Sequence, residues 1–327
     1  MIFIENPSTN PWFNLAAEEY LLKNHNEEFL LIWRSDSSVV VGKHQVPVAE
    51  ANLKFLEKNN IPIIRRTSGG GTVFHDHNNI NFTVITNQEK PEINFVKHTK
   101  PIIDFLQSIG LNAKFEGKND IKINGFKVSG NSAHINKHKI LYHGTLLFDS
   151  KLELLESALS NSNAKIESKA IKSNRSKVAN ISDLLHPAIS IEDFQSKLTK
   201  YLLKYFLVTT EKNFTDIEKT LINKLSEEKY KSNEWNYCYS PDYYYRNEHV
   251  FEGRKIEYAF YVKKGVMTSF DYIKGDLSVN CQAFFESLEG CKHVPDEIIK
   301  HFSLFQKKIP PAKSCNITAE DCLSAFF

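Results

Sequence analysis

The segment from residue 65 to residue 79, RRTSGGGTVFHDHNN, concentrates the side chains of this 327-residue chain that are best suited to chemistry. Two arginines precede three consecutive glycines, and His75, Asp76 and Asn79 follow. Guanidinium groups beside bare backbone N–H groups form a cradle for phosphate oxygens. A glycine triplet is costly in backbone entropy and marks a close approach of a ligand or another backbone. Neither a GxxxxGK[ST] loop nor a GxGxxG pattern is present, so the residues alone predict an anion- or nucleotide-binding loop.

Strand-like runs on both sides of this segment are expected to position it. Ile61 to Ile64 leads into the glycines, and Ile80 to Thr86 follows as the second wall of the pocket. Two more apolar runs, 29–33 and 38–41, are typical of buried strands. Residues 120–148 predict a meander, because an Asn-Gly turn at 124 and 125 separates alternating runs.

Apolar residues at helical spacing predict helices at 12–24, 49–59, 98–109, 152–159, 191–206, 281–288 and 295–305. In the first helix the apolar residues Phe13, Ala16, Ala17, Tyr20 and Leu21 form one face, which leaves Glu18 and Glu19 for the polar side. Residues 160–177 have little apolar content, so they are either a mobile surface loop or a lid.

The composition changes after Tyr230, where an aromatic, turn-rich segment is followed by alternating strands separated by Gly265 and Gly275. We therefore expect two domains, a catalytic domain at 1–244 and a small α+β accessory domain at 245–327. The tyrosines of YYYR at 243–246 are expected to pack between the domains rather than to stack on bases.

Composition excludes several classes of protein. The chain is 41% hydrophobic and 24% charged, with a net charge of +2 and interleaved signs, so no large nucleic-acid surface is indicated. No signal peptide and no run long enough for a membrane span are evident. All five cysteines follow residue 237 without a CxxC pair, which indicates reduced thiols in a cytoplasmic protein rather than disulfides or a zinc site.

RRTSGGGTVFHDHNN resembles the RRxSGGGxVxHDxGN signature of the lipoate–protein ligases, which share a superfamily with biotin ligases and octanoyltransferases. Other stretches similar to the family occur in the expected order, namely NPWFNLAAEE, SSVVVGKHQ, KNDIKINGFKVSGNSA, HGTLL, SNRSKVANIS and EWNYCYSP. The resemblance covers nearly the whole chain and is closest to the long, two-domain form, although the last 80 residues match only in pattern. It implies an α+β fold with a mixed or antiparallel sheet in the catalytic domain.

The resemblance implies that ATP and lipoate form lipoyl-AMP, whose acyl group is then attacked by an acceptor lysine. Lys127 matches the family lysine that contacts the lipoyl carbonyl and the adenylate phosphate, and from sequence alone it could equally be an exposed strand lysine. Arg66 matches a phosphate-contacting arginine, whereas Arg65 is either a second contact or a structural ion-pair partner. The stretch that wraps the nucleotide corresponds to Gly71, Thr72, Val73 and Phe74.

A second group of residues is implied with less specific roles. His75, Asn79, Ser129 and His143 are expected to contribute to the lipoate–adenylate pocket, and both histidines have a structural, hydrogen-bonding alternative. Asp120 is the best carboxylate for Mg²⁺, which takes one or two carboxylates plus phosphate oxygens, or it is a turn residue. Trp33 and residues 38–42 are candidates for the walls of an apolar tunnel.

Arg175, Ser176 and Lys177 resemble the family's RSxV element, either as a lid that keeps water from the adenylate or as a solvated basic loop. Asn78 departs from the family, which usually has glycine there. Asn is the non-glycine residue that best tolerates a left-handed backbone, so the turn is expected to survive.

Two alternatives remain beside the ligase. A lipoyltransferase that takes preformed lipoyl-AMP, or lipoyl groups from another protein, would share these motifs. A non-catalytic lipoate- or nucleotide-binding module would share the fold. A cysteine-dependent octanoyltransferase is excluded because no cysteine precedes Cys238. The expected acceptors are lipoyl domains of 2-oxoacid dehydrogenase complexes and the glycine cleavage H protein, and the sequence does not separate lipoate from octanoate as the substrate.

Overall fold

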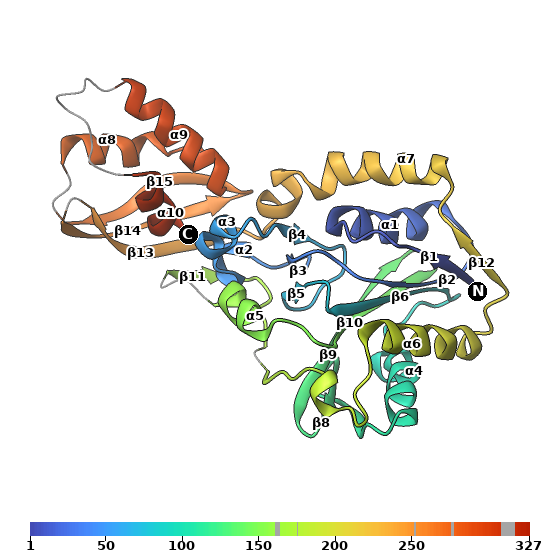
Figure 1. Ribbon diagram of the computed structural model, residues 1–327. Coiled ribbons are helices and arrows are strands. Elements are labelled where there is room, and N and C mark those ends of the chain that lie inside the picture. Colours follow the sequence, from blue (N-terminus) through green and yellow to red (C-terminus); the bar gives the residue numbers. More distant parts are fainter. Residues whose placement is uncertain (161–163, 175, 252, 276–277, 309–317) are drawn as a thin grey trace. The chain divides into compact units, whose positions relative to one another are not determined.

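The computed structural model describes residues 1–160, 164–174, 176–251, 253–275, 278–308 and 318–327 (Figure 1). The chain forms two compact units. The first consists of Met1–Gly42, Ile64–Leu155 and Asn174–Lys231, and the second of Lys43–Ile63, Glu156–Ser173 and Ser232–Phe327. The domain boundary expected between residues 244 and 245 stays a prediction.

An eight-stranded sheet forms the frame of the first unit. In spatial order its strands are β12 (Thr210–Asn213), β1 (Ile2–Glu5), β2 (Phe29–Trp33), β6 (Asn79–Asn87), β10 (Lys139–Leu147), β9 (Phe126–Asn136), β8 (Asp120–Ile123) and β7 (Ala113–Glu116). Strand β1 runs parallel to β12 and β2, whereas the other neighbours are antiparallel. The expected mixed sheet is confirmed, and so is the meander of β8, β9 and β10.

The turn between β8 and β9 has the geometry that its sequence predicts. Asn124 and Gly125 both have positive φ, 52° and 83°, as a two-residue hairpin turn of type I′ requires. The turn places Lys127 at the start of β9, where it pairs with Lys122 of β8.

Helices cover both faces of this sheet (Figure 1). On one face α4 (Phe95–Ser108) and α6 (Ile191–Tyr205) complete the apolar core, in which Phe105 and Phe194 join Phe82 and Leu146 of the sheet. The other face is covered by α1 (Pro11–Asn24) and α7 (Asp216–Leu225). A short 3-10 turn, η1 (Ser182–Leu184), precedes α6 in the chain. Successive strand residues alternate between faces, so the polar residues Thr83 and His143 lie on the α1 side, beside buried apolar residues such as Leu31 and Leu141.

Glu18 and Glu19 overturn one expectation, because both are buried at 2% exposure instead of lying on the polar side of α1. Lys23, Lys229 and Tyr230 hold the Glu19 carboxylate, with Lys229 Nζ 2.6 Å from Oε2. Burial alone would raise the pKa of Glu19, but hydrogen bonds from Lys229, Lys23 and Tyr230 outweigh it, and the pKa is lowered. These contacts fix α1 to the π-helical turn η2 (Ser226–Tyr230) that follows α7.

A three-stranded sheet carries the glycine segment. Its order is β4 (Ile63–Arg65), β3 (Ser38–Val41) and β5 (Val73–His75), and β3 and β5 are antiparallel. The chain between β4 and β5 is therefore the loop of residues 66–72, as the flanking strand-like runs predict.

The second unit contains a four-stranded sheet, β11 (Lys165–Ser168), β13 (Tyr243–Phe251), β14 (Arg254–Lys263) and β15 (Val266–Lys274). Its helical segments are α2 (Pro47–Glu50), α3 (Leu53–Lys58), η3 (Glu234–Cys238), α8 (Val279–Ser287), α9 (Pro295–Lys308) and α10 (Ala319–Phe326). The helix α5 (Leu152–Leu159) includes the last residues of a first-unit segment and the first of a second-unit segment. Strands and helices predicted after residue 245 are confirmed in this unit.

Two expectations about this unit are wrong. The helix predicted over 49–59 is two helices, because the chain leaves helical conformation at Ala51 and Asn52, and the Asn52 side chain caps α3 by accepting from Phe55 N. Residues 160–177 are not loop alone, because β11 pairs with β13 through the register Ile166 to Tyr245.

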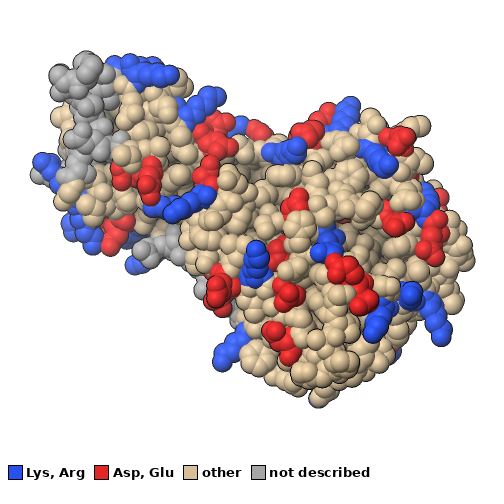
Figure 2. Space-filling model, in the orientation of Figure 1, with Lys and Arg blue, Asp and Glu red and all other residues tan. Residues whose placement is uncertain are grey.

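Charged side chains of both signs are interspersed on the face drawn in Figure 2. No helix in the described ranges is long and apolar enough to cross a membrane. Cys238, Cys281, Cys291 and Cys322 form no disulfide bond among the described residues, and Cys315 lies outside those residues.

Gly144 of β10 offers a test of the packing between the central strands. A Cβ there would lie 2.5 Å from Phe82 Cζ and would overlap Asn131 Oδ1. We expect Gly144→Ala to lower the free energy of unfolding by about 1–3 kcal/mol, measured by urea denaturation, because the neighbours must shift. Gly69→Ala is the matched control, since its Cβ meets no heavy atom within 4 Å. Equal stability of the two variants would contradict this account.

Candidate active site

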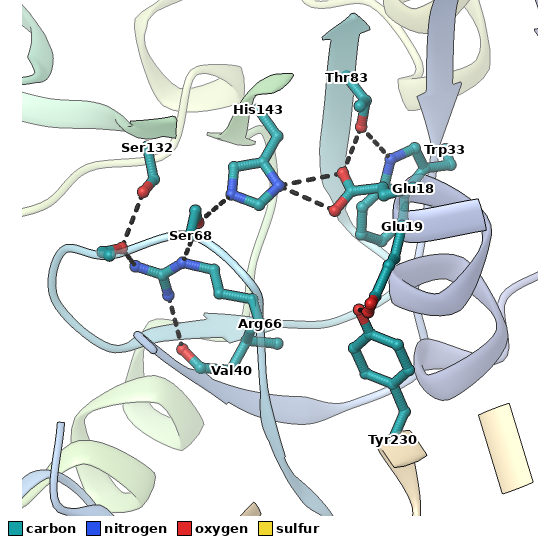
Figure 3. Close-up of polar contacts among 11 residues, drawn as sticks. Glu18, Glu19, Trp33, Val40, Arg66, Ser68, Thr83, Ser132, His143 and Tyr230 are labelled. Atoms are coloured by element: carbon teal, nitrogen blue, oxygen red, sulfur yellow. Dashed lines mark hydrogen bonds and ion pairs between the residues drawn. The ribbon is translucent and has the colours of Figure 1, made fainter. Parts of the chain in front are cut away.

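A buried arginine holds the glycine loop in shape. Arg66 is 5% exposed, and its Nη2 donates to the carbonyl oxygens of Gly69 and Gly71, the latter at 2.8 Å. Its Nη1 donates to Val40 O at 3.1 Å and its Nε to Ser68 Oγ at 2.9 Å (Figure 3). Arg66 therefore ties three points of the loop to the neighbouring strand β3.

Gly70 shows why the loop needs glycine. Its φ of +85° lies in the left-handed region, and a Cβ would come within 3.1 Å of Arg66 Nη2. Burial lowers the pKa of Arg66 to about 10, which leaves the guanidinium charged near neutral pH. The four donated bonds are directed at protein oxygens, and the phosphate contact expected of Arg66 stays a prediction.

Ser68 connects this loop to the large sheet. Its Oγ lies 2.6 Å from His143 Nε2, and His143 Nδ1 lies 2.9 Å from Glu18 Oε2 (Figure 3). Because a carboxylate only accepts, Nδ1 carries the proton toward Glu18, and in the neutral imidazole Nε2 then accepts the Ser68 hydroxyl hydrogen. The chain of bonds thus runs in one direction, from Arg66 through Ser68 and His143 to Glu18.

The same carboxylate receives a second chain of bonds from the other side. Thr83 Oγ1 donates to Glu18 Oε1 at 2.5 Å and accepts from Trp33 Nε1 at 3.0 Å (Figure 3). This use of the Trp33 nitrogen leaves its ring as an apolar surface. Glu18 is consequently the point at which helix α1, strand β2 and strand β6 are joined.

Sequence reasoning missed Glu18 and Ser68. Glu18 stands three residues after Leu15 and four before Leu22, both of which are buried, so its position in the apolar spacing was a usable signal. Ser68 matches the serine of the signature RRxSGGG, which was the usable signal for it.

His75 lies against Trp33, with ring centroids 5.8 Å apart. Burial, assisted by the charge of Arg66 and by His143, lowers the pKa of His75 to about 3. The imidazole is therefore neutral near neutral pH. Val73, two residues earlier in β5, shares the His75 face, whereas Phe74 is turned the other way and is 1% exposed.

Asn79 anchors the turn that follows β5. Its Nδ2 donates to Phe74 O at 2.7 Å, and Ser150 Oγ donates to its Oδ1. Asp76 completes the turn by accepting from Asn78 N at 2.9 Å. Asn78 is not among the residues with positive φ, so the expected left-handed backbone at that position is wrong and asparagine needs no special tolerance there.

Lys127 and Asp120 meet at the edge of the same sheet face. Lys127 Nζ lies 2.8 Å from Asp120 Oδ1, and the two side chains are 22% and 16% exposed. A Cβ on Gly130 would be 3.2 Å from Lys127 Nζ, so glycine at 130 leaves room for the ammonium. Ser176 Oγ is 3.5 Å from Asp120 Oδ2.

The segment that follows Arg175 runs beside this lysine. Lys127 N donates to Lys177 O at 2.8 Å, and Ala179 N donates to Lys127 O at 3.2 Å. Of the expected lid residues, Ser176 and Lys177 thus lie at the site, and Arg175 lies outside the described residues.

Ser129 does not join the other predicted site residues. It pairs in register with Leu146, which belongs to the apolar core, and Asn131 Nδ2 donates to its Oγ at 3.2 Å. Cross-strand partners share a face, so the Ser129 side chain points away from His143 and Thr145. Gly71 and Thr72 are half-buried in the loop before β5.

The comparisons with known proteins agree on one protein family. The model of the lipoyl protein ligase A/B catalytic domain matches residues 10–203. Lipoate–protein ligase 1 of Staphylococcus aureus is 41% identical over 301 residues, which cover 90% of this chain and 90% of that protein.

Two solved structures are similar at 26% identity. Lipoate-protein ligase A bound with ATP has a TM-score of 0.62 and covers 72% of this chain and 97% of its own. A bipartite lipoate protein ligase, studied with its E2 lipoyl domain from Thermoplasma acidophilum, has a TM-score of 0.62 and covers 72% of this chain and 94% of its own.

Arg66→Lys tests the role of the guanidinium in holding the loop. An ammonium group cannot reach the separate oxygens of Val40, Ser68 and Gly71, so we expect a loss of about 2–4 kcal/mol in the free energy of unfolding. Arg34→Lys is the control, because Arg34 pairs with the exposed Glu192 and should change stability by less than about 1 kcal/mol. Denaturant titration of both variants measures the difference, and equal losses would refute the assigned role.

His75 predicts a specific dependence of stability on pH. Its folded pKa of about 3 lies below the ordinary value of 6.5, so the unfolded chain binds the proton first and stability is lost as pH falls from 6.5 toward 3. When the pH is lowered from about 7.5 to about 5, this effect costs the wild-type protein roughly 2 kcal/mol of unfolding free energy, and we expect His75→Asn to abolish that part of the decrease. The exposed His138 provides a control, His138→Gln, which should keep the wild-type dependence.

Proposed function

This chain belongs to the lipoate–protein ligase family, and we infer from that membership that it attaches lipoate to a lysine of an acceptor protein at the expense of ATP. Lipoate and ATP form lipoyl-AMP and pyrophosphate, and the acceptor lysine then attacks the acyl carbon so that AMP leaves. Negative charge develops on oxygen in both steps. Fixed cations and hydrogen-bond donors therefore supply the catalysis.

The position of Lys127 is the observation that carries the proposal. Its ammonium lies over Gly130 on the sheet face that also bears His143, and Ser132 Oγ fixes the glycine loop to that face by donating to Gly69 O at 2.8 Å. The Lys127 ammonium and the glycine loop thus lie on the same sheet face. We assign Lys127 to the lipoyl carbonyl and the adenylate phosphate, where a compact ammonium can bind both oxygens.

Asp120 has two roles in this proposal. It balances the charge of Lys127 through the 2.8 Å ion pair, and the adenylate phosphate would replace it as the partner of the ammonium. The carboxylate released in this way suits Mg²⁺, which accepts a single protein carboxylate when phosphate oxygens fill other positions. The described residues gather no group of three His, Cys, Asp or Glu side chains, so Mg²⁺ would be held mainly through the nucleotide.

Lipoyl domains are the acceptors that the relatives support. The Thermoplasma acidophilum ligase is described with its E2 lipoyl domain, and we extend that acceptor class to this chain. Domains of 2-oxoacid dehydrogenase complexes and the glycine cleavage H protein are the specific acceptors that we propose.

Lys127→Ala tests this function. With ATP, lipoate and an apo lipoyl domain, the wild-type protein should release pyrophosphate and increase the mass of the domain by one lipoyl group. We expect kcat/KM of the variant to fall by at least about 100-fold, because a donor to the developing oxyanion is lost. Lys114→Ala, at an exposed lysine of β7, should retain wild-type activity.

The same assay separates the alternatives. Modification that occurs only from preformed lipoyl-AMP, without pyrophosphate release from ATP and free lipoate, would identify a lipoyltransferase. Binding of lipoate without any acceptor modification would identify a non-catalytic module. Full activity of Lys127→Ala would exclude the role assigned to this lysine.

A further inference from the structure

The site face of the large sheet carries two adjacent rows of residues that run across the strands. The first row contains Thr83 of β6, His143 of β10 and Ser132 of β9, which are register partners. Each of these side chains has a hydrogen-bond partner, in Glu18, Ser68 or the carbonyl of Gly69. Helix α1 and the glycine loop thus provide the hydrogen-bond partners of all three side chains in this row.

The second row differs, because its central polar groups have no partner. It runs through Trp33, Asn81, Thr145, Gly130 and Asp120, each in register with the next. Asn81 is 2% exposed and Thr145 is 7% exposed. Within the described part of the chain, Asn81 Nδ2 and Oδ1 and Thr145 Oγ1 make no hydrogen bond.

Buried polar atoms without partners are rare because each carries an uncompensated desolvation penalty. Asn81 and Thr145 are direct cross-strand neighbours, so their unpaired atoms lie side by side on the site face. They stand in the row between Trp33 and Gly130, over which the Lys127 ammonium lies. A ligand that extends from Lys127 along the row would meet Thr145 first and Asn81 next.

Distances along the row match the length of the lipoyl chain. Neighbouring strands are about 4.8 Å apart, so Asn81 lies two strands, or about 10 Å, from Gly130. A carboxyl oxygen within hydrogen-bond distance of Lys127 Nζ uses about 3 Å of this span. Five C–C bonds of about 1.5 Å in an extended chain take up about 6–7 Å more and bring the first sulfur-bearing carbon to Asn81.

The groups around Asn81 suit sulfur. The Trp33 ring borders Asn81 across the strand pair, and divalent sulfur makes favourable contacts with aromatic rings. Sulfur is a weak hydrogen-bond acceptor, but a methylene group accepts no hydrogen bond at all. A site that pairs a buried donor with its substrate rejects an analogue that leaves the donor unpaired.

We propose that the Asn81 side-chain amide donates a hydrogen bond to the dithiolane sulfur of lipoate, and that it thereby makes the enzyme prefer lipoate to octanoate. The Thr145 hydroxyl, one strand nearer to Lys127, donates to the carboxyl group that all such acids share. This inference rests on the proposed function, and it assigns the choice of acyl group to one residue of β6.

The test compares three acids in ATP-dependent modification of an apo lipoyl domain. They are lipoate, octanoate and 5-cyclopentylpentanoate, in which two methylene groups replace the sulfurs of the same five-membered ring. The wild-type enzyme should have a kcat/KM for lipoate at least about tenfold above that for either sulfur-free acid. The cyclopentyl acid isolates the sulfurs from the shape of the ring.

Two variants should give different patterns. Asn81→Leu, of similar size, should lower kcat/KM for lipoate and bring the ratio of lipoate to cyclopentyl acid close to one. Thr145→Val should lower kcat/KM for all three acids by a similar factor and keep the wild-type ratio. Asn81→Ser, which introduces no additional volume, should also reduce the ratio, and it replaces Asn81→Leu if thermal denaturation shows that the latter is not folded.

Several outcomes would overturn the inference. A wild-type ratio near one would do so without any variant, and so would an unchanged ratio in the Asn81 variants or an equal loss for all acids. If the wild-type protein modified the lipoyl domain with none of the three acids, the proposed function itself would be wrong. Modification by lipoate without discrimination would leave that function intact and reject only the role of Asn81.

Discussion

The burial of one positive charge organises this catalytic unit. Arg66 is charged, 5% exposed and surrounded by carbonyl oxygens of the glycine loop and β3, and a buried ion is tolerated only when its hydrogen-bonding capacity is used. The loop bends to supply these oxygens, which is why Gly70 adopts a left-handed backbone. At the other end of the chain of bonds, the buried carboxylate of Glu18 offsets the charge through Ser68 and His143.

This arrangement decides which parts of the sheet face remain free for a ligand. In the row that contains Thr83 and His143, the side-chain polar atoms of both residues already form hydrogen bonds with α1 or the glycine loop. In the neighbouring row, the side-chain polar atoms of Asn81 and the hydroxyl of Thr145 have no hydrogen-bond partner among the described residues. If the substrate binds along the second row as proposed, the fixed first row beside it is a pre-organised wall, which lowers the ordering cost of binding.

Much of the fold could be read from the sequence, because strand alternation and the Asn124–Gly125 turn are local signals. Resemblance then predicted that distant segments bearing Arg66, Lys127 and His143 would meet. The buried pair of Glu18 and His143 could not be read in this way, since its partners are 125 residues apart and helical spacing indicates a face but no partner. The split of the predicted helix at Asn52 was missed because residues flanking it have helical spacing, although asparagine is a common helix cap.

Arg66 and Lys127 therefore have different physical roles. Arg66 is fixed by four bonds to the protein, and any anion that approached its guanidinium would have to displace one of the oxygens that shape the loop. Lys127 has a single carboxylate partner, is partly exposed and is carried on a flexible stem over Gly130. An ammonium can exchange one anionic partner for another at little structural cost, whereas a caged guanidinium cannot. In the proposed function, this difference lets the glycine loop remain in place while the Lys127 ammonium would exchange the Asp120 carboxylate for the adenylate phosphate.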